Sequence, residues 1–461
     1  MNEFVKEKSN ERLWIKQPLA VFNGTHPTTE SAGGLVVENG LIVELVADGA
    51  TPARSVSNTF DASSMIVTPG LINTHHHFYQ TLTRCNRNAL NKSLFGWLSA
   101  LYPIWANLDR DMVQVASELA IAELMLSGCT TVSDHHYLFS RAISDAIDIE
   151  IQTAQSMGVR AVITRGSMNL GRLSGGLPPE EVVQSHDDIL QDSERLISRY
   201  HDSEAGAMTQ VALAPCSPFS VTPELLSDTA LMAEKYDVLL HTHLAETTDE
   251  DEFCQQTFGC RPLEHLQRAG WSGARSWFAH GIHFTPEEIQ ELGREGFGVC
   301  HCPTSNMLLA SGVCNVVDLE KAGVRVGIGV DGSSSNDSSN MVGEVRQALL
   351  LQRLGSGMST SHVDALRWAT RGGANLLRRQ DIGRISVGAC ADLAFFKLDD
   401  LSSSGCDDPL AGVVLSGIRH VEALMIAGKW RVVSGELIDV DLPSLMVRHR
   451  KAAARLNEAL I

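Results

Sequence analysis

Short apolar runs rich in β-branched residues recur along the middle of the chain and alternate with segments of helical periodicity. The runs are MIVTPGLIN (65–73), TTVSD (130–134), RAVITR (160–165), QVALAP (210–215), VLLHTH (238–243), SWFAH (276–280), FGVCHC (297–302) and VRVGIGVD (324–331). Strands that alternate with helices predict parallel β–α units. Eight such units predict an α/β fold of the (β/α)8, TIM-type barrel. A doubly wound open sheet is the alternative, but no G-x-G-x-x-G follows an early strand.

The segments between the runs carry the signals that start and stop helices. Residues 110–128 have apolar side chains at helical spacing, and Gly128 is the expected stop. Thr222 and Thr285 each precede a proline, which is the pattern of an N-cap followed by proline in the first helical turn. We therefore expect a helix after the fourth run and another after the sixth.

Both ends of the chain read as β-hairpins instead. Residues 12–67 include AGGLVVENGLIVELVADG, in which ENG predicts a tight turn between two strands, and residues 383–436 include two similar stretches with glycine turns. We predict one small β-sandwich made of residues 1–67 and 379–440, packed beside a barrel of residues 68–378. Residues 441–461 are charged and helical in pattern, and we expect an arm that crosses a neighbouring subunit of a homo-oligomer.

Charge and cysteine usage limit the class of partner. The 461 residues carry 37 Lys and Arg against 55 Asp and Glu, a formal net charge of −18. This balance argues against nucleic acid and anionic membrane surfaces and leaves a small molecule as the partner. The charged start, MNEFVKEKSNERLWIK, lacks the apolar core of a signal peptide, and no run approaches the ~20 apolar residues of a membrane span. Ten scattered cysteines fit a reducing compartment, so we expect a cytoplasmic protein.

Three consecutive histidines follow the first apolar run, in LINTHHHFYQ. Because successive strand residues point to opposite faces, His75 and His77 are expected to project together into the barrel while His76 points away. Two imidazoles on one face can bind a metal, although an H-x-H pair alone is also compatible with a polar strand end.

Later runs end in residues that complete a metal site. The fifth run continues to His243 and Glu246, the sixth ends in His280, and the eighth ends in Asp331. A buried carboxylate is costly unless it is paired or bound to metal. His75, His77, His243 and Asp331 at one end of the barrel therefore predict a divalent metal site, for which zinc is best suited while iron or manganese would also fit. The CHC of residues 300–302 lacks the C-x-x-C spacing of structural zinc sites and is not expected to bind metal.

The order of H-x-H, HLAE, AHG and VDG along the chain resembles the amidohydrolase superfamily, and more narrowly its mononuclear deaminases, over nearly the whole length. HHHFYQTLTR, DHHYLF, APCSPFSVT, HGIHF and CHCPTSNM are similar to motifs of deaminases that act on 8-oxoguanine. The resemblance implies His75, His77, His243 and Asp331 as ligands of one metal. Dinuclear members carry a carboxylated lysine on the fourth strand, where this chain has Cys216.

The resemblance also implies a reaction. A metal-activated hydroxide would attack C2 of 8-oxoguanine and release urate and ammonia. Asp331 and His280 would orient that hydroxide and take its proton, and Glu246 would protonate the adjacent ring nitrogen.

Five further residues are candidates for binding a purine or related heterocycle. Gln80 can read a purine edge with its carboxamide, Arg165 can meet a carbonyl oxygen, and Cys216 replaces a histidine that meets ribose in nucleoside deaminases of the superfamily. Trp97 and Tyr102 can cover a flat ring, although aromatics at their spacing also fit simple packing.

Two other classes of function stay open. One is a related hydrolase acting on isoxanthopterin, guanine, adenosine-type nucleosides or a chlorinated ring. The other is a non-enzymatic metal-binding barrel, which release of ammonia from amino-heterocycles would exclude.

Overall fold

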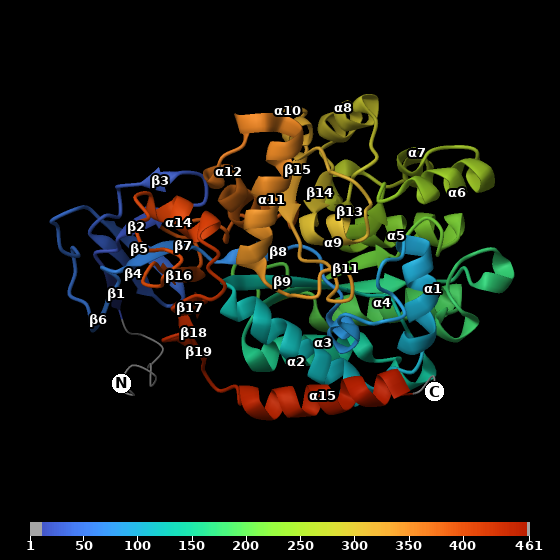
Figure 1. The fold of residues 1–461 in the computed structure, drawn as a ribbon, viewed down its shortest axis with the longest axis horizontal. Helices are drawn as coiled ribbons and strands as arrows, with labels where there is room; N and C mark the ends of the chain where they lie inside the picture. The colour runs from blue at the N-terminus through green and yellow to red at the C-terminus, as the bar shows by residue number, and fades with distance from the viewer. Residues whose placement is uncertain (1–11, 459–461) are drawn as a thin grey trace.

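The computed structural model describes residues 12–458, and their central part forms a closed parallel barrel of eight strands (Figure 1). The predicted barrel is confirmed, with one barrel strand in each of the eight apolar runs. The strands are β8 (Leu71–Asn73), β9 (Cys129–His136), β10 (Arg160–Ser167), β11 (Thr209–Pro215), β12 (Leu240–Leu244), β13 (Ser276–His280), β14 (Gly298–His301) and β15 (Arg325–Ile328). Most of these strands are buried on both faces, which explains why they read as continuous apolar runs.

The first apolar run divides into two strands that belong to different sheets. Residues Met65–Pro69 form β7 of the sandwich, and β8 of the barrel begins two residues later. Gly70 stands between them, and a Cβ at this position would lie 2.0 Å from Thr130 Oγ1. The chain can therefore cross from the sandwich to the barrel here only because residue 70 has no side chain.

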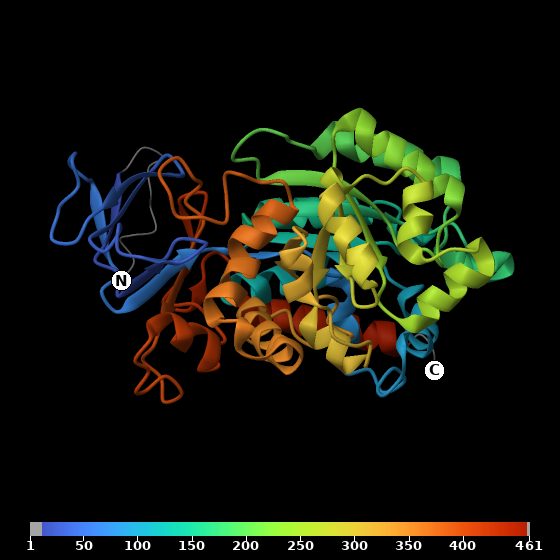
Figure 2. The same cartoon turned by 90° about the horizontal axis from the view of Figure 1, so that it is seen from above.

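The sandwich consists of two sheets beside the barrel (Figure 2). One sheet has the order β5 (Leu41–Val46), β4 (Gly34–Glu38), β1 (Leu13–Lys16), β6 (Asn58–Asp61). The other has the order β19 (Glu436–Leu437), β18 (Lys429–Val433), β17 (Ala423–Ile426), β16 (Leu393–Lys397), β7, β2 (Ala20–Phe22), β3 (Pro27–Thr28). Because β7 pairs antiparallel with β16, the second sheet is built from both ends of the chain. The predicted ENG turn joins β4 to β5, with positive φ at Asn39 and Gly40.

Most helices surround the barrel and come between or after its strands, whereas the last two along the chain come between and after strands of the sandwich. They are α1 (Leu94–Trp105), α2 (Arg110–Leu126), α3 (Ala146–Met157), α4 (His186–Tyr200), α5 (Pro223–Tyr236), α6 (Thr248–Phe258), α7 (Pro262–Arg268), α8 (Pro286–Glu295), α9 (Pro303–Leu308), α10 (Val316–Lys321), α11 (Met341–Ser356), α12 (His362–Arg367), α13 (Gly373–Leu376), α14 (Pro409–Leu415) and α15 (Leu442–Glu458). The two predicted N-caps are confirmed. Thr222 accepts from Leu225 N at the start of α5, and Thr285 forms a capping box with Glu288 at the start of α8.

The C-terminal helix α15 packs on its own barrel, along α2 (Figure 1). Its Leu445 and Leu456 are buried, and Arg455 pairs with Asp109 at 2.8 Å. The buried side of this helix is therefore covered within the chain, and its expected contact with a neighbouring subunit stays a prediction. Residues 1–11, part of the charged start, and residues 459–461 lie outside the described residues. Within residues 12–458, no helix combines the length and apolar character that a membrane crossing requires.

Candidate metal and active site

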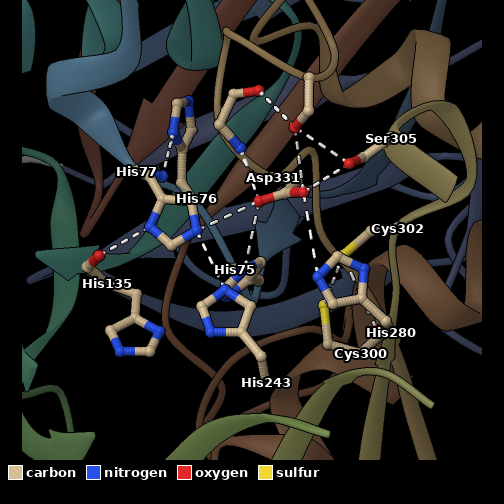
Figure 3. A network of polar contacts seen from close by, with 12 residues as sticks. His75, His76, His77, His135, His243, His280, Cys300, Cys302, Ser305 and Asp331 are labelled. Carbon is tan, nitrogen blue, oxygen red and sulfur yellow. Dashed lines mark hydrogen bonds and ion pairs between the residues drawn. The ribbon is translucent and has the colours of Figure 1, made fainter. Parts of the chain in front are cut away.

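The three consecutive histidines lie beyond their strand rather than on it. β8 ends at Asn73, so strict strand alternation does not set their directions. The segment nevertheless turns His75 and His77 toward Asp331 (Figure 3). His76 points away to Ser339, and its Nε2 lies 2.9 Å from Ser339 Oγ. His76 is fully buried and accepts from the backbone N–H of His77. The middle histidine therefore holds the loop, and the outer two face the barrel axis.

Four side-chain atoms converge at the carboxyl end of the barrel. Nε2 of His75 and Nε2 of His77 each lie 3.3 Å from Asp331 Oδ1. His243 completes the group, with its Nε2 3.2 Å from Nε2 of His77. One ligand atom from each of these four residues lies within 4.8 Å of the other three.

The hydrogen bond that each of the three histidines donates through Nδ1 shows that its Nε2 carries no proton. His77 Nδ1 donates to His135 O, and His243 Nδ1 donates to Cys216 O, each over 2.7 Å. His75 Nδ1 donates to His241 Nε2, which can accept because His241 Nδ1 donates to Trp277 O. All three proposed ligand histidines thus carry the proton on Nδ1 and present a bare Nε2 to one point.

Burial and hydrogen bonding together fit this cluster to a metal cation. Burial lowers the pKa of His75 and of His243 well below the usual value, so both are neutral, as ligation requires. Nε2 of His75 is buried and has no hydrogen-bond partner among residues 12–458, although buried polar atoms are nearly always paired. Three bare nitrogens and a carboxylate are a donor set suited to zinc and similar divalent ions.

Glu246 and His280 stand beside the four ligand atoms. His280 Nε2 lies 3.6 Å from Glu246 Oε2 and 4.0 Å from Asp331 Oδ2, so the three groups face a common point. Burial raises the pKa of Glu246, which favours its protonated form. His280 and Asp331 both have positive φ, 74° and 61°. This left-handed conformation costs energy in residues with a side chain and clusters at functional sites.

A partly open cavity of about 410 Å³ of non-atom space, which includes some open solvent, contains these groups in its wall. Gln80, Trp97, Tyr102 and Cys216, four of the five residues expected to contact substrate, line it. The complete lining is His77, Gln80, Leu94, Trp97, Leu98, Tyr102, Tyr137, Cys216, Ser217, Phe219, His243, Glu246, His280, Leu309, Asp331 and Ser335. Apolar walls with a few polar groups are typical of small-molecule sites.

Local contacts hold two of these side chains in place. Gln80 Oε1 accepts from Ser334 N, and Trp97 Nε1 donates to Ser334 O. A Cβ at Gly332 would lie 1.9 Å from Gln80 Oε1. The glycine of the VDG motif therefore makes space for the glutamine.

Arg165 is not part of the cavity, so its expected contact with substrate was wrong. Its guanidinium is buried outside the barrel lumen, where it pairs with Asp192 of α4 at 3.0 Å and donates to Gln184. It also stacks on the ring of Phe139. Through these contacts the planar guanidinium group of Arg165 connects β10 to α4.

Four further histidines near strand ends form hydrogen bonds with the backbone and with neighbouring side chains. His135 donates through Nε2 to Ala214 O, and His241 bridges His75 to the backbone. His136 contacts Glu150 and Leu138 O, and His283 contacts Ser311 O. The Sγ atoms of Cys300 and Cys302 lie 3.8 Å apart, and both thiols are buried.

Sequence reasoning missed several residues that touch the site. Tyr137 and Ser335 line the cavity, and Glu250 accepts from the backbone N–H groups of Ala245 and Glu246. Ser305 and Asn306 contact Asp331 and His280. The last two lie in CHCPTSNM, a motif that had been noted without a role for either residue.

A closed parallel barrel with three imidazoles and a carboxylate at the carboxyl ends of its strands defines a metal-dependent barrel hydrolase. Comparison with known proteins agrees, because residues 66–431 match the Amidohydrolase family. The chain belongs to this family.

Three relatives illustrate the similarity. The chain is 54% identical over 446 residues to 8-oxoguanine deaminase of Pseudomonas aeruginosa, covering 96% of this chain and 99% of the relative. It is 34% identical over 471 residues to an isoxanthopterin deaminase from an unknown prokaryotic organism, covering 97% and 98%. The solved structure of an atrazine chlorohydrolase from Arthrobacter aurescens TC1 complexed with zinc superposes with a TM-score of 0.90 at 29% identity, covering 96% and 100%.

Proposed function

We propose that this protein hydrolyses 8-oxoguanine to urate and ammonia. The observation that carries the proposal is the convergence of a buried Glu246, His280 and Asp331 on the cavity that also receives the bare nitrogens of three histidines. The 54% identical relative named 8-oxoguanine deaminase supports the choice of substrate.

His75, His77, His243 and Asp331 would hold one divalent metal, and zinc is our choice. The donor set suits zinc, and a solved relative is complexed with zinc. Such an ion, when bound, lowers the pKa of water so that hydroxide is available near neutral pH. Cys216 on the wall of the site supports a single metal, because burial raises its pKa to about 12 and keeps the thiol neutral.

Glu246 is the proposed proton donor to the ring. Its raised pKa lets it carry a proton at neutral pH, and it lies on the cavity wall beside His280. Protonation of the ring nitrogen next to C2 makes that carbon electrophilic. The resulting carboxylate can take up the proton that the attacking water loses to Asp331 and His280, since His280 Nε2 lies 3.6 Å from Glu246 Oε2. It can then pass this proton to the departing amine, which leaves as ammonia.

His280 and Asp331 act on the proton of the attacking water. Asp331 Oδ2 and His280 Nε2 face the same point from two sides. Both residues have a left-handed backbone, with φ of 74° at His280 and 61° at Asp331, a conformation that is typical of functional sites.

The cavity wall supports a planar base without a sugar. Trp97, Leu98 and Phe219 supply apolar surface, and Gln80 supplies a carboxamide edge. Cys216 is a weak hydrogen-bond partner, so a ribose hydroxyl placed there would lose its hydrogen bonds to water at a cost of about 1–3 kcal/mol.

Comparison of kcat/KM for 8-oxoguanine, guanine, isoxanthopterin and adenosine at equal metal loading tests the proposal. Ammonia release and the ultraviolet change from 8-oxoguanine to urate are the two readouts. We expect 8-oxoguanine to be the best substrate. A higher value for isoxanthopterin would favour the second function, which the 34% identical relative supports. A higher value for adenosine or guanine would contradict the substrate argument.

Ten free cysteines, eight of them buried, support a cytoplasmic location. The expected homo-oligomer stays a prediction, for which the elution volume and scattering mass of the purified chain are the test.

A further inference from the structure

Two adjacent residues of the short helix α9 contact the two groups proposed to handle the proton of water. Ser305 Oγ donates to Asp331 Oδ2 over 2.6 Å, and Asn306 Oδ1 lies 2.9 Å from His280 Nδ1. Both residues are 1% exposed, so water does not compete for these contacts. Figure 3 shows Ser305 approaching Asp331 from the side opposite His77.

The contact with Asn306 decides which nitrogen of His280 carries a proton. A carboxamide oxygen accepts but cannot donate, so His280 Nδ1 must hold the hydrogen. In a neutral ring the proton on Nδ1 leaves Nε2 with a lone pair. That nitrogen is the one facing Glu246 and Asp331, where an acceptor for the proton of water is needed.

The contact with Ser305 gives the two carboxylate oxygens of Asp331 different partners. Oδ2 accepts from Ser305 and, at 3.2 Å, from Ser335. Oδ1 accepts from Gly332 N over 2.7 Å and lies toward His75 and His77. A carboxylate whose Oδ2 accepts from Ser305 and Ser335 and whose Oδ1 accepts from Gly332 N cannot rotate freely, so Oδ1 stays directed at the metal-binding point.

We propose that Ser305 and Asn306 form a positioning pair that presents Oδ1 of Asp331 to the metal and the lone pair of His280 Nε2 to the reacting water. The pair acts through these two side chains and does not touch substrate, since neither residue lines the cavity. This inference rests on the proposed function for its meaning, but its geometry can be tested without a substrate.

Long-range ¹H–¹⁵N correlation spectra of zinc-loaded protein with ¹⁵N-labelled histidine directly test the contact between Asn306 and His280. The His280→Gln spectrum identifies the His280 signals among the 17 histidines. We expect a protonated Nδ1 and a bare Nε2 in the parent protein. The opposite orientation of the Asn306 amide would place the proton on Nε2 of His280. That result would contradict the proposed role of Asn306.

Three variants connect the tautomer to turnover. Asn306→Leu keeps the volume but removes the acceptor, and we expect kcat to fall by about 10–100-fold, the usual effect of losing a residue that orients a site group, with KM changing less and zinc content unchanged. Asn306→Asp keeps an acceptor and should retain the Nδ1 proton and most of kcat. Met307→Leu, on the same helix and partly exposed, is the matched control and should match the parent.

The contact between Ser305 and Asp331 is tested separately, by the affinity of the protein for zinc. Ser305→Ala should weaken zinc binding by about 10–100-fold in competition with a chelator, and Ser305→Thr should restore it. Parent-like zinc affinity in Ser305→Ala, or parent-like kcat in Asn306→Leu, would refute the pair. If none of the amino-heterocycles is turned over, the proposed function fails, while the spectra and the chelator competition still decide the positioning.

Discussion

Removal of His77 is the sharpest test of the proposed metal cluster. Its Nε2 lies 3.3 Å from Asp331 Oδ1 and 3.2 Å from His243 Nε2, so it contacts two of the other three ligand residues. His77→Ala deletes one of four donors. It also leaves His135 O without the hydrogen that His77 Nδ1 donates.

The expected loss follows from linkage between binding and folding. A metal at about 1,000 times its Kd stabilises the folded chain by about 4.1 kcal/mol. Residues that only orient metal ligands change affinity by about 10–100-fold, so loss of a ligand itself is expected to reach at least the upper value. The same free metal is then at about 10 times Kd, and its stabilisation falls to about 1.4 kcal/mol. His77→Ala should therefore lose about 2.7 kcal/mol of zinc-dependent stability.

His76→Ala is the matched control because it removes the neighbouring imidazole from the same loop. His76 bonds Ser339 and the His77 amide, so its loss should cost about 1–3 kcal/mol whether or not zinc is present. The assay is denaturant unfolding with and without zinc, together with elemental analysis of each purified variant. Full metal content and an unchanged zinc effect in His77→Ala would refute the assignment.

Three further predictions concern buried carboxyl groups. Glu246→Gln should hold zinc but lose about 100-fold or more in kcat, since an amide cannot transfer the proton; near-normal turnover would remove Glu246 from the mechanism. Glu250→Gln should lower kcat by about 10-fold or more at unchanged zinc content, because its new NH2 group faces one of the backbone donors that now bond Glu250; an unchanged kcat would show that the turn does not depend on it. Burial raises the pKa of Glu150 to about 8, so between about pH 4.3, its unfolded pKa, and about 8 the folded chain keeps a proton that the unfolded chain has lost. Its contribution to stability is thus complete at low pH and falls as pH rises through this window; Glu150→Gln should flatten the fall in denaturant unfolding, and an equal slope in both proteins would contradict the assignment.

The apolar runs predicted the barrel because parallel strands buried on both faces leave an unbroken hydrophobic signal. The division of the first run at Gly70 was not predictable from that signal. Both halves of the run are apolar and extended, and only the approach of Thr130, which lies on another strand, shows where the chain changes sheets. The C-terminal helix shows the same limit, since its amphipathic pattern indicates that one face is covered but not by which part of the protein.

The candidate site was predictable where a residue type and a strand end coincide. His243, His280 and Asp331 each close or follow a strand, and the carboxyl ends of barrel strands meet at one face. Arg165 is also near the end of a strand, but it points outward to α4. Sequence position places a residue at the rim but does not determine on which side of the strand it lies. Glu250, Ser305 and Asn306 reach the site from helices after the strands, so their roles depend on loop geometry.

Closure of the barrel and assembly of the site occur at the same place. The last barrel strand, β15, pairs with the first, β8, through Ile328 and Asn73. Beyond that pair Asn73 Oδ1 accepts from Val330 N, and Asp331 N donates to His75 O. These bonds bring Asp331 beside His75, so a carboxylate and an imidazole that lie far apart in the sequence become neighbours only when the barrel closes. A cation held between them would bridge the two strands that close the barrel. Its binding energy would therefore oppose opening at that junction, in addition to supplying the chemistry of the site.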